Sequence, residues 1–381
     1  MSFTLTDEQQ MILEMVRKMV KEKILPRAAQ IDDEGVYPED IFKLLREQGL
    51  FGMVIPKEYG GSGTDILTFC LVLEEIAKAC YNTAYILVMT YVPASCILEA
   101  GNEAQKAFYL KRLASGEYRG AFATTEPGAG SDLGGIKTRA MYKDHSYILN
   151  GRKSFITNST VSDFIIIFAK THPDAGTAGL SAFIVEKGNP GLSIGKIESK
   201  MGGKGVPSAE VILEDCKVPE ENLLGEENKA FQIAMRSFNR SRPIIGARAV
   251  GLAQGALDIA IDYAKQREAF GKTVASFQGI QFMIADMAMQ IEASRQLVYK
   301  AASLLDQGQQ GKEVTRIISM AKCFSTDVAM RVAIDAAQIL GAYGYVKDFP
   351  SERYIRDAKS MQIVEGTNQI QRVIIANTLL N

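Results

Sequence analysis

Hydrophobic residues in the first third of the chain recur every three or four positions, which is the spacing of one face of an α-helix. Thr6 lies three residues before Gln9 at the start of such a stretch, a pairing typical of a capping box. A second short helix is expected between Pro38 and Gly49. The stretches ILTFCLVLEEIAKAC, AYILVMTYVPASCILEAG and NEAQKAFYLKRLASGE are expected to form three further helices, the first two mostly buried. We therefore predict a helical domain over residues 1–118.

The pattern changes near residue 119 to short runs of β-branched and aromatic residues separated by Gly, Pro, Asn and Asp. DFIIIFAKT, GLSAFIVEK, GLSIGKI and AEVILEDCKV are typical of strands. YILNGRKSFITN contains Asn150-Gly151 between two such runs, and this dipeptide favours a hairpin turn. Residues 119–226 are therefore predicted to form a small antiparallel sheet or β-barrel-like domain.

Helical spacing returns for residues 227–381. Ile284, Ile291, Val298 and Leu305 repeat every seven residues, as expected for the seam of a helix packed lengthwise in a bundle. We predict a C-terminal four-helix-bundle domain. The fold class is mainly α with a central β domain.

The charge of the chain argues against a broad electrostatic surface. The 381 residues include 43 basic and 44 acidic side chains, a formal net charge of −1. This balance offers no extended cationic face for nucleic acid or an anionic membrane. We identify no uninterrupted apolar run long enough to span a bilayer, and therefore expect a soluble, intracellular protein with no membrane partner.

Metal and thiol chemistry is also disfavoured. The five cysteines are dispersed without a CxxC pair and the two histidines lie in polar, turn-like contexts, so no metal site is predicted. Dispersed cysteines in odd number suit a reducing compartment. No GxGxxG follows a strand and opens a helix, which excludes the Rossmann fingerprint.

Two segments combine hydroxyl groups with small or aromatic residues. FATTEPGAGSD carries Thr124, Thr125 and Ser131 beside residues small enough to let a ligand approach the backbone. KSFITN adds Phe155 and Thr157, an aromatic face and a hydroxyl group. Together they could hold a planar heterocycle, whereas from composition alone a surface turn and an ordinary strand remain open.

The C-terminal segment VEGTNQ places Glu365 between apolar residues and a Gly-Thr pair. Gly366 would let a ligand or backbone come near, and Thr367 is a plausible N-cap of the last helix. A carboxyl group in a dry cleft would have a raised pKa and could act as a base. The alternative is a solvated carboxylate at a helix end.

Taken together, seven motifs resemble the acyl-CoA dehydrogenase family over essentially the whole chain. They are TEPGAGSD, GRKSFITN, RAVGLAQGALD, QREAFGK, FQGIQFMIADM, QILGAYGY and VEGTNQIQR. The family has an N-terminal helical domain, a middle β domain and a C-terminal helical domain, in the order predicted above. The resemblance implies FAD as cofactor.

The resemblance also implies roles for individual residues. Those implied to contact FAD, some of them in a neighbouring subunit, are Phe122, Thr124, Thr125, Phe155, Thr157, Arg267, Phe270, Gln278, Gln338, Gly341, Thr367 and Gln369. Those implied near the thioester or its acyl group are Ser131, Asn239, Arg242 and Gly366. Glu365 matches the general base of the family. Some relatives carry that base at the position of Ser241, and a serine cannot serve in its place.

The activity implied is α,β-dehydrogenation of an acyl-CoA thioester, with electrons passed to an electron-transfer flavoprotein. The resemblance further implies a homo-oligomer, most plausibly a tetramer, in the cytoplasm of a bacterium or in the mitochondrial matrix of a eukaryote. Alternatives are the reverse reaction as an enoyl-CoA reductase, an oxidase, or a non-catalytic helical scaffold. Tyr91 and Phe238 hint at a modest acyl cavity, although both could be ordinary core residues.

Overall fold

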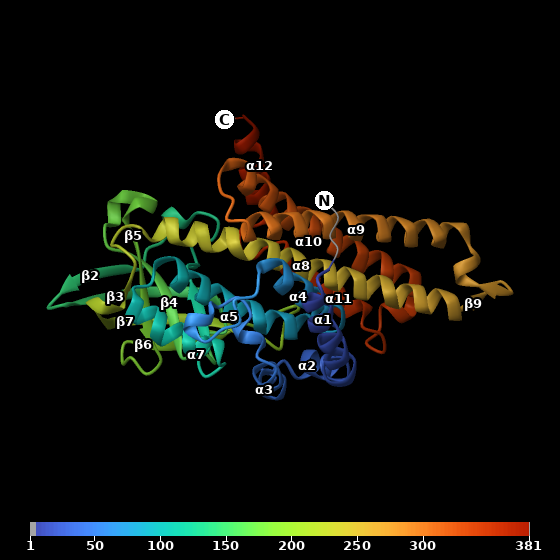
Figure 1. The fold of residues 1–381 in the computed structure, drawn as a ribbon, viewed down its shortest axis with the longest axis horizontal. Helices are drawn as coiled ribbons and strands as arrows, with labels where there is room; N and C mark the ends of the chain where they lie inside the picture. The colour runs from blue at the N-terminus through green and yellow to red at the C-terminus, as the bar shows by residue number, and fades with distance from the viewer. Residues whose placement is uncertain (1–4, 381) are drawn as a thin grey trace.

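The computed structural model describes residues 5–380. Its N-terminal part is a group of helices packed beside the long C-terminal helices (Figure 1). Thr6 caps the first helix through the expected capping box with Gln9. The helices are α1 (Asp7–Met19), α2 (Ala28–Glu34), α3 (Glu39–Glu47), α4 (Ile66–Ala79), α5 (Tyr81–Ala100), α6 (Glu103–Gln105) and α7 (Lys111–Ala114). The five helical stretches predicted for this part of the chain are confirmed.

The central part is a mainly antiparallel sheet. Its strands are β1 (Gly120–Ala123), β2 (Arg139–Lys143), β3 (Ser146–Thr157), β4 (Phe164–Lys170), β5 (Leu180–Glu186), β6 (Leu192–Ile197), β7 (Ser208–Pro219) and β8 (Leu223–Leu224). The order is β6-β7-β3-β2-β4-β5-β8, and β1 pairs with β4. The β1–β4 pairing and a single β2–β4 contact are parallel, so the sheet is not purely antiparallel as predicted.

The hairpin predicted at Asn150-Gly151 is wrong. β3 runs through this dipeptide, and the turn lies earlier, at Asp144 and His145, whose φ angles are 49° and 55°. The register between β3 and β7 shifts across Gly151. A Cβ added at Gly151 would lie 2.4 Å from Thr138 Oγ1, so glycine serves close packing in a bulge here rather than a turn.

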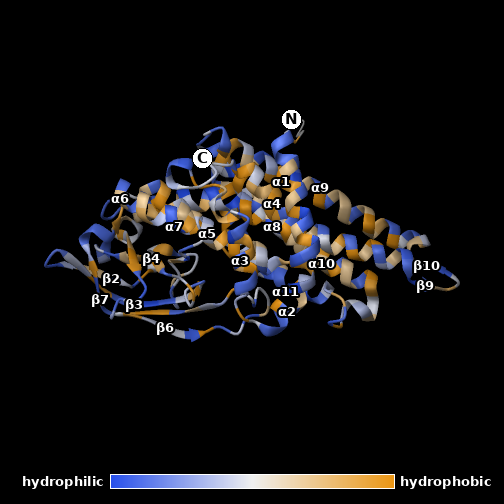
Figure 2. Ribbon diagram, turned by 60° about the horizontal axis from the view of Figure 1, so that its bottom comes forward, coloured by the Kyte–Doolittle hydropathy of each residue, from blue (hydrophilic) through white to orange (hydrophobic). Residues whose placement is uncertain are grey.

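The C-terminal part is built on three long helices. Its elements are α8 (Ala230–Gln266), β9 (Glu268–Ala269), β10 (Lys272–Thr273), α9 (Gln278–Asp306), α10 (Lys312–Leu340), α11 (Ser351–Met361) and α12 (Asn368–Leu380). Ile291 and Val298, in the middle of the predicted seam, are fully buried, while Ile284 and Leu305 at its ends are half-buried. Figure 2 shows hydrophobic residues concentrated where α4, α5 and α8 meet and mixed with hydrophilic ones along α9.

Two helices correct the view that no apolar run is long enough to cross a membrane. Among residues 5–380, α5 and α8 each contain an 18-residue window of sufficient hydropathy, 1.4 and 1.5 respectively. In each window 78% of the residues are buried inside the protein. Their hydrophobicity therefore has a structural explanation, because both helices lie in the core between other elements.

Candidate active site

A cavity of about 640 Å³ opens where the helical parts meet the sheet. Its walls come from α5, β1 and the loop after it, the end of β3, α8, the segment that joins α11 to α12, and α12 itself. The residues that line it include Tyr85, Met89, Val92, Phe122, Thr124, Thr125, Ser131, Phe155, Thr157, Phe231, Met235, Phe238, Arg242, Ile245, Glu365, Gly366, Thr367 and Ile370. This lining is largely apolar, with several hydroxyl groups and the carboxyl groups of Asp132 and Glu365.

Ten of the seventeen catalytic, cofactor-binding and substrate-binding residues predicted from the sequence line the cavity. They are Phe122, Thr124, Thr125, Ser131, Phe155, Thr157, Arg242, Glu365, Gly366 and Thr367. Segments more than 200 positions apart along the chain therefore meet at one site. Tyr91, in contrast, is a core residue packed against Phe69, with ring centroids 5.8 Å apart, and does not line the cavity.

Glu365 enters the cavity from a strained turn. Its φ angle is 55°, in the left-handed region that non-glycine residues rarely adopt. The hydroxyl group of Ser241, on α8, donates a hydrogen bond to Glu365 Oε2. Burial raises the pKa of Glu365, and this effect outweighs the Ser241 hydrogen bond and the positive charges of Arg248, Arg242 and Lys322. The structure thus favours a desolvated carboxyl group over a solvated one.

Three side chains fix the backbone on which Glu365 stands. Lys322, fully buried in α10, donates a hydrogen bond of 2.9 Å to the carbonyl oxygen of Gly366. Gln371 Nε2 donates to the same oxygen at 3.1 Å and to the carbonyl oxygen of Glu365 at 3.3 Å. Arg242 Nε approaches the Glu365 carbonyl oxygen at 3.5 Å, and its Nη1 donates to Asn239 Oδ1 at 2.7 Å.

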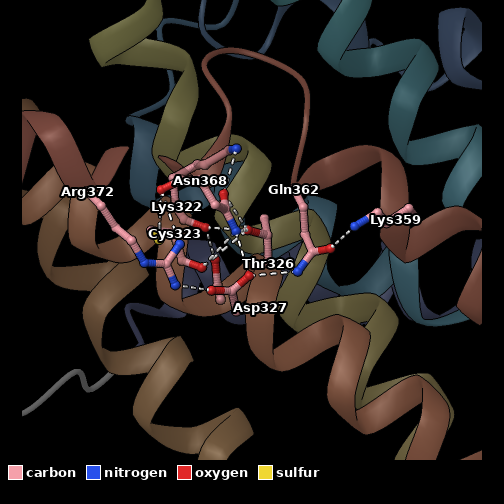
Figure 3. A network of polar contacts seen from close by, with 9 residues as sticks. Lys322, Cys323, Thr326, Asp327, Lys359, Gln362, Asn368 and Arg372 are labelled. Atoms are coloured by element: carbon pink, nitrogen blue, oxygen red, sulfur yellow. Dashed lines mark hydrogen bonds and ion pairs between the residues drawn. The ribbon is translucent and has the colours of Figure 1, made fainter. Parts of the chain in front are cut away.

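A polar network behind this turn joins α10 to the start of α12 (Figure 3). Asn368 sits at its centre and receives a hydrogen bond of 3.0 Å from Lys322 Nζ. Its amide nitrogen donates to Asp327 at 2.7 Å, and Arg372 forms a 2.6 Å ion pair with the same carboxylate. Thr367 Oγ1 accepts from Ile370 N at 3.3 Å, as an N-cap should.

The structure changes the interpretation of Gly366. Its φ angle is 87°, and a Cβ built there would lie 2.7 Å from Gln371 Nε2. The group that comes close to Gly366 is thus the protein's own amide side chain. The backbone N–H of Glu365 beside it has no hydrogen-bond partner among residues 5–380. A free N–H next to a carboxyl group in a cavity is a donor for an oxygen atom of a ligand.

The part of the lining formed by Thr124, Phe155 and Thr157, called the ring-binding wall below, is suited to a planar ring with polar edges. Phe155 is 63% exposed, with a φ angle of 59°, at a bulge in β3 that turns its ring out of the sheet pairing. Thr157 Oγ1 lies 3.2 Å from Tyr85 Oη and 3.0 Å from Ser208 Oγ. An exposed aromatic face beside hydroxyl groups in a cavity of this size fits the isoalloxazine ring of FAD.

A buried ion pair supports this wall from behind. Lys153 Nζ, fully buried, lies 2.8 Å from Glu126 Oε1 and donates to the carbonyl oxygen of Thr124 at 3.2 Å. Glu126 also receives hydrogen bonds from Lys137 N and Thr138 N, at 2.7 and 3.0 Å. The pair thus ties β3 to the segment that carries the hydroxyl groups.

Seven of the predicted residues lie outside the cavity. They are Asn239, Arg267, Phe270, Gln278, Gln338, Gly341 and Gln369. Phe270, 93% exposed, is at the tip of the β9–β10 hairpin, at the end of the molecule away from the sheet (Figure 1). Within one chain, Arg267, Phe270 and Gln278 therefore cannot reach the cavity, and their predicted role depends on a neighbouring subunit.

Sequence reasoning missed several residues of the site, namely Tyr85, Ile245, Lys322, Gln371 and Arg248. A lysine inside the apolar face of SMAKCFS and an arginine within IIGARAVGLA were the available signals, because a charge in a buried helix face requires a partner. Of residues 5–380, no group of three or more His, Cys, Asp or Glu side chains is placed to bind a metal ion. All five cysteines are buried and free.

Sequence models of three domains of one family match consecutive parts of the chain. Residues 6–117 match the acyl-CoA dehydrogenase N-terminal domain, residues 121–216 the middle domain and residues 228–380 the C-terminal domain. Together these matches cover nearly all of the described chain.

Full-length relatives agree. An acyl-CoA dehydrogenase of Bacillus subtilis strain 168 is 48% identical, with 98% of each chain covered. A cyclohex-1-ene-1-carbonyl-CoA dehydrogenase of Syntrophus aciditrophicus is 46% identical, covering 99% of this chain and 91% of the other. An acryloyl-CoA reductase (NADH) of Anaerotignum propionicum is also 46% identical, covering 100% and 96%.

Solved structures share the whole fold. Butyryl-CoA dehydrogenase from Megasphaera elsdenii superposes with a TM-score of 0.97 at 43% identity, covering 100% of both chains. A chain from a structure described as the electron transferring flavoprotein of Acidaminococcus fermentans gives a TM-score of 0.97 at 45% identity, again covering 100% of both chains. An FAD complex of PigA gives 0.94 at 30% identity, covering 100% of this chain and 99% of the other. The protein belongs to the acyl-CoA dehydrogenase family.

Proposed function

We propose that this protein, an FAD-dependent oxidoreductase of the acyl-CoA dehydrogenase type, removes the α-proton and a β-hydrogen from an acyl-CoA thioester to give a trans-2-enoyl-CoA. The observation that carries the proposal is the Glu365 carboxyl group. It lines the same cavity as Phe155 and Thr157, accepts a hydrogen bond from a buried serine, and has a raised pKa.

Glu365 is proposed to take the α-proton. A carboxylate in water is too weak a base for a carbon acid beside a thioester, and the raised pKa brings it closer to the basicity that the step needs. The turn is held by Lys322, Gln371 and Arg242, so the carboxyl group is positioned before substrate binds.

The free N–H of Glu365 is proposed to bind the thioester carbonyl oxygen. Negative charge develops on that oxygen as the α-proton leaves, and a preorganised donor stabilises it. Thr124, Thr125 and Thr157, with Phe155, are the residues that would hold the isoalloxazine ring against the acyl group. When bound, FAD supplies the acceptor for the β-hydrogen as hydride. The apolar walls formed by Phe122, Phe238 and neighbouring residues exclude water from the reacting carbons.

The remaining assignments are proposals about partners. The similarity to a chain from a structure named for an electron transferring flavoprotein supports such a protein as electron acceptor. The distance of Arg267, Phe270 and Gln278 from the cavity supports an oligomer, for which we propose a tetramer, in which these residues meet the cofactor of a neighbour. Five buried, free cysteines support a reducing compartment, for which we propose the bacterial cytoplasm.

The reverse reaction is the second candidate. A relative that is 46% identical over the full chain is named an acryloyl-CoA reductase. This name supports the reverse reaction as an alternative for a protein of this family. The same base in its protonated form would return the proton to the α-carbon. Direction then depends on the potentials of substrate and electron partner, and supplying an enoyl-CoA with reduced electron-transfer flavoprotein tests it directly.

Substitution of Glu365 by glutamine tests the function. The variant should retain the yellow cofactor, while the rate of flavin bleaching by a reactive acyl-CoA falls by about 10²–10⁴-fold. Glu226→Gln, at an exposed position, is the matched control and should bleach as the unmodified protein does. Bleaching of Glu365→Gln at the rate of the control would refute the assignment. A colourless purified protein would instead favour a non-catalytic scaffold, and rapid reoxidation by O₂ alone would favour an oxidase.

A further inference from the structure

Arg248 is a fully buried arginine whose hydrogen-bonding groups are unused. It lies on α8 with 0% of its surface exposed. None of its three guanidinium nitrogens, Nε, Nη1 and Nη2, has a hydrogen-bond partner among the described residues. Its Cζ lies 4.5 Å from the centroid of the Tyr81 ring and 4.3 Å from that of the Tyr85 ring.

This arrangement is unfavourable in the protein alone. A buried arginine normally forms bidentate hydrogen bonds with a carboxylate or phosphate, because a desolvated charge without an acceptor costs several kcal/mol. Contact with aromatic faces compensates only a part of that loss. The five N–H donors of Arg248 therefore need an acceptor from a molecule other than this chain.

Arg248 stands behind the closed end of the cavity. The cavity opens where Ser131, Asp132 and Phe155 are exposed, and ends at Tyr85 and Ile245, which are buried. Ile245 is less than one helical turn before Arg248 on α8. Ser241, which bonds to Glu365, lies seven residues before Arg248, or roughly 10 Å along the helix axis. The guanidinium group is nevertheless close enough to act on Glu365, because its positive charge partly opposes the effect of burial on the pKa of that carboxyl group.

The charges around this end are of both signs. Lys200 Nζ lies 5.8 Å from the Tyr85 ring centroid and donates a hydrogen bond to the Val206 carbonyl oxygen. Two carboxyl groups also act in this region. The charge of Asp357, fully buried, partly opposes the burial that lowers the pKa of Lys200, and the charge of Arg248 partly opposes the burial that raises the pKa of Glu365. None of these groups gives the Arg248 guanidinium a hydrogen-bond acceptor among residues 5–380.

We propose that Arg248 makes the closed end of the acyl cavity selective for an acyl group that ends in a carboxylate. The inference rests on the proposed function, because it places the thioester at Glu365 and the far end of the acyl group near Tyr85. A carboxylate there supplies the acceptor that Arg248 lacks, and burial inside a low-dielectric cavity strengthens the pairing.

Tyr85 separates the cavity from the guanidinium group and acts as the movable part of this subsite. Its hydroxyl group has one hydrogen-bond partner among the described residues, Thr157 at 3.2 Å. A turn of the ring breaks that single bond and exposes the guanidinium N–H groups to the carboxylate. With the ring in place, the charge of Arg248 still acts across it at 4.3 Å from its centroid.

The test compares CoA esters of equal chain length with and without the terminal carboxylate. Hexanoyl-CoA is paired with adipoyl-CoA, and octanoyl-CoA with suberoyl-CoA, and kcat/KM for flavin reduction is measured with the holoenzyme. We expect at least one carboxylated ester to exceed its neutral partner by about tenfold or more, as one charge-assisted pair would give. Preference for the neutral ester in both pairs overturns the proposal. Failure of every ester to bleach the flavin refutes the proposed function instead.

Substitutions at Arg248 and Tyr85 show which residue causes the preference for carboxylated esters. Arg248→Gln should abolish the preference for the carboxylate, measured as the ratio of kcat/KM between the two esters of a pair, and Arg248→Lys should retain part of that preference. Any effect of the lost charge on Glu365 acts on both esters alike and cancels in this ratio. Tyr85→Phe keeps the ring and loses the Thr157 bond, so the preference should persist. An equal loss for both esters in Arg248→Gln would show a purely structural role. If that variant does not fold, the preference of the unmodified enzyme and of Arg248→Lys still decides the question.

Discussion

The hydroxyl group of Ser241 donates a hydrogen bond to the carboxylate of Glu365, although the two residues are 124 positions apart in the chain. Ser241 is fully buried on α8, and Glu365 stands on the turn before α12. Ser241, which cannot itself serve as a base, thus acts on the residue proposed as the base. Its hydrogen bond stabilises the charged form of Glu365 and partly offsets the effect of burial on the pKa.

Ser241→Ala should move the pH dependence of flavin reduction upward. Loss of a hydrogen bond to a charged group costs about 1.5–3 kcal/mol, which corresponds to roughly one to two pKa units. Because the base works only when deprotonated, the rising limb of kcat/KM shifts to higher pH, and the rate at high pH changes less. Ser237→Ala, one turn away on the same helix, is the control and should leave the limb in place. An unshifted limb in Ser241→Ala would contradict the role assigned to this bond.

Lys322→Met should loosen the turn that holds Glu365. The lysine donates to the Gly366 carbonyl oxygen and to Asn368 Oδ1, and both acceptors lose a buried donor in the variant. We expect a loss of about 1–3 kcal/mol in the free energy of unfolding, together with a fall in kcat that exceeds any change in KM. Chemical denaturation and bleaching kinetics measure the two effects. Lys300→Met, at an exposed position on α9, should change neither.

The same lysine predicts a pH dependence of stability. Burial lowers the pKa of Lys322 to about 8 in the folded protein, against about 10.4 in an unfolded chain. Between these values the unfolded chain binds more protons, so this group makes stability rise as pH increases from about 8 towards 10.4. The difference in unfolding free energy between the unmodified protein and Lys322→Met, followed across that range, isolates the contribution. A constant difference would mean that the buried amine does not titrate there.

Glu126→Gln should lower the free energy of unfolding more than removal of the whole Glu126–Lys153 ion pair does. The single substitution leaves the Lys153 charge buried without its partner at 2.8 Å, a loss of about 3–5 kcal/mol for pairs of this kind. In the double variant Glu126→Gln, Lys153→Met no charge remains, so the loss should be smaller than the sum of the single losses. Urea denaturation of all four proteins gives the coupling energy. Strict additivity would show that the pair does not hold the wall together.

The arrangement of the helices and most strands was predictable because their hydrophobic spacing reflects which face is buried. The capping box at Thr6 and the strands β4 to β7 follow from local chemistry alone. The hairpin prediction at Asn150-Gly151 failed because glycine suits both a turn and a tight bulge. Which of the two forms depends on the close approach of Thr138 from another segment. Local sequence does not encode such a long-range contact.

The candidate site shows the same limit. Glu365 and the hydroxyl groups of Thr124 and Thr157 were identified from motifs taken together, whereas Lys322 and Arg248 were missed. Each of the latter interrupts an apolar helix face, but helical spacing does not tell whether a charge is neutralised by a carbonyl oxygen, by a ring face or by a ligand. The answer depends on segments that fold against the helix from elsewhere in the chain.

Gly366→Ala should disturb the base without touching its carboxyl group. The φ angle of Gly366 is 87°, and an added Cβ would lie 2.7 Å from Gln371 Nε2, which holds the carbonyl oxygens of Glu365 and Gly366. The side chain of Gln371 must move, and the residue adopts a left-handed conformation that alanine disfavours by about 1–2 kcal/mol. We therefore expect lower stability and slower bleaching with the cofactor still bound. Gly279→Ala, on α9 with no atom within 4 Å of the new Cβ, should be neutral or slightly stabilising. If Gly366→Ala matched that control in thermal unfolding and in bleaching rate, the turn would not be positioning Glu365.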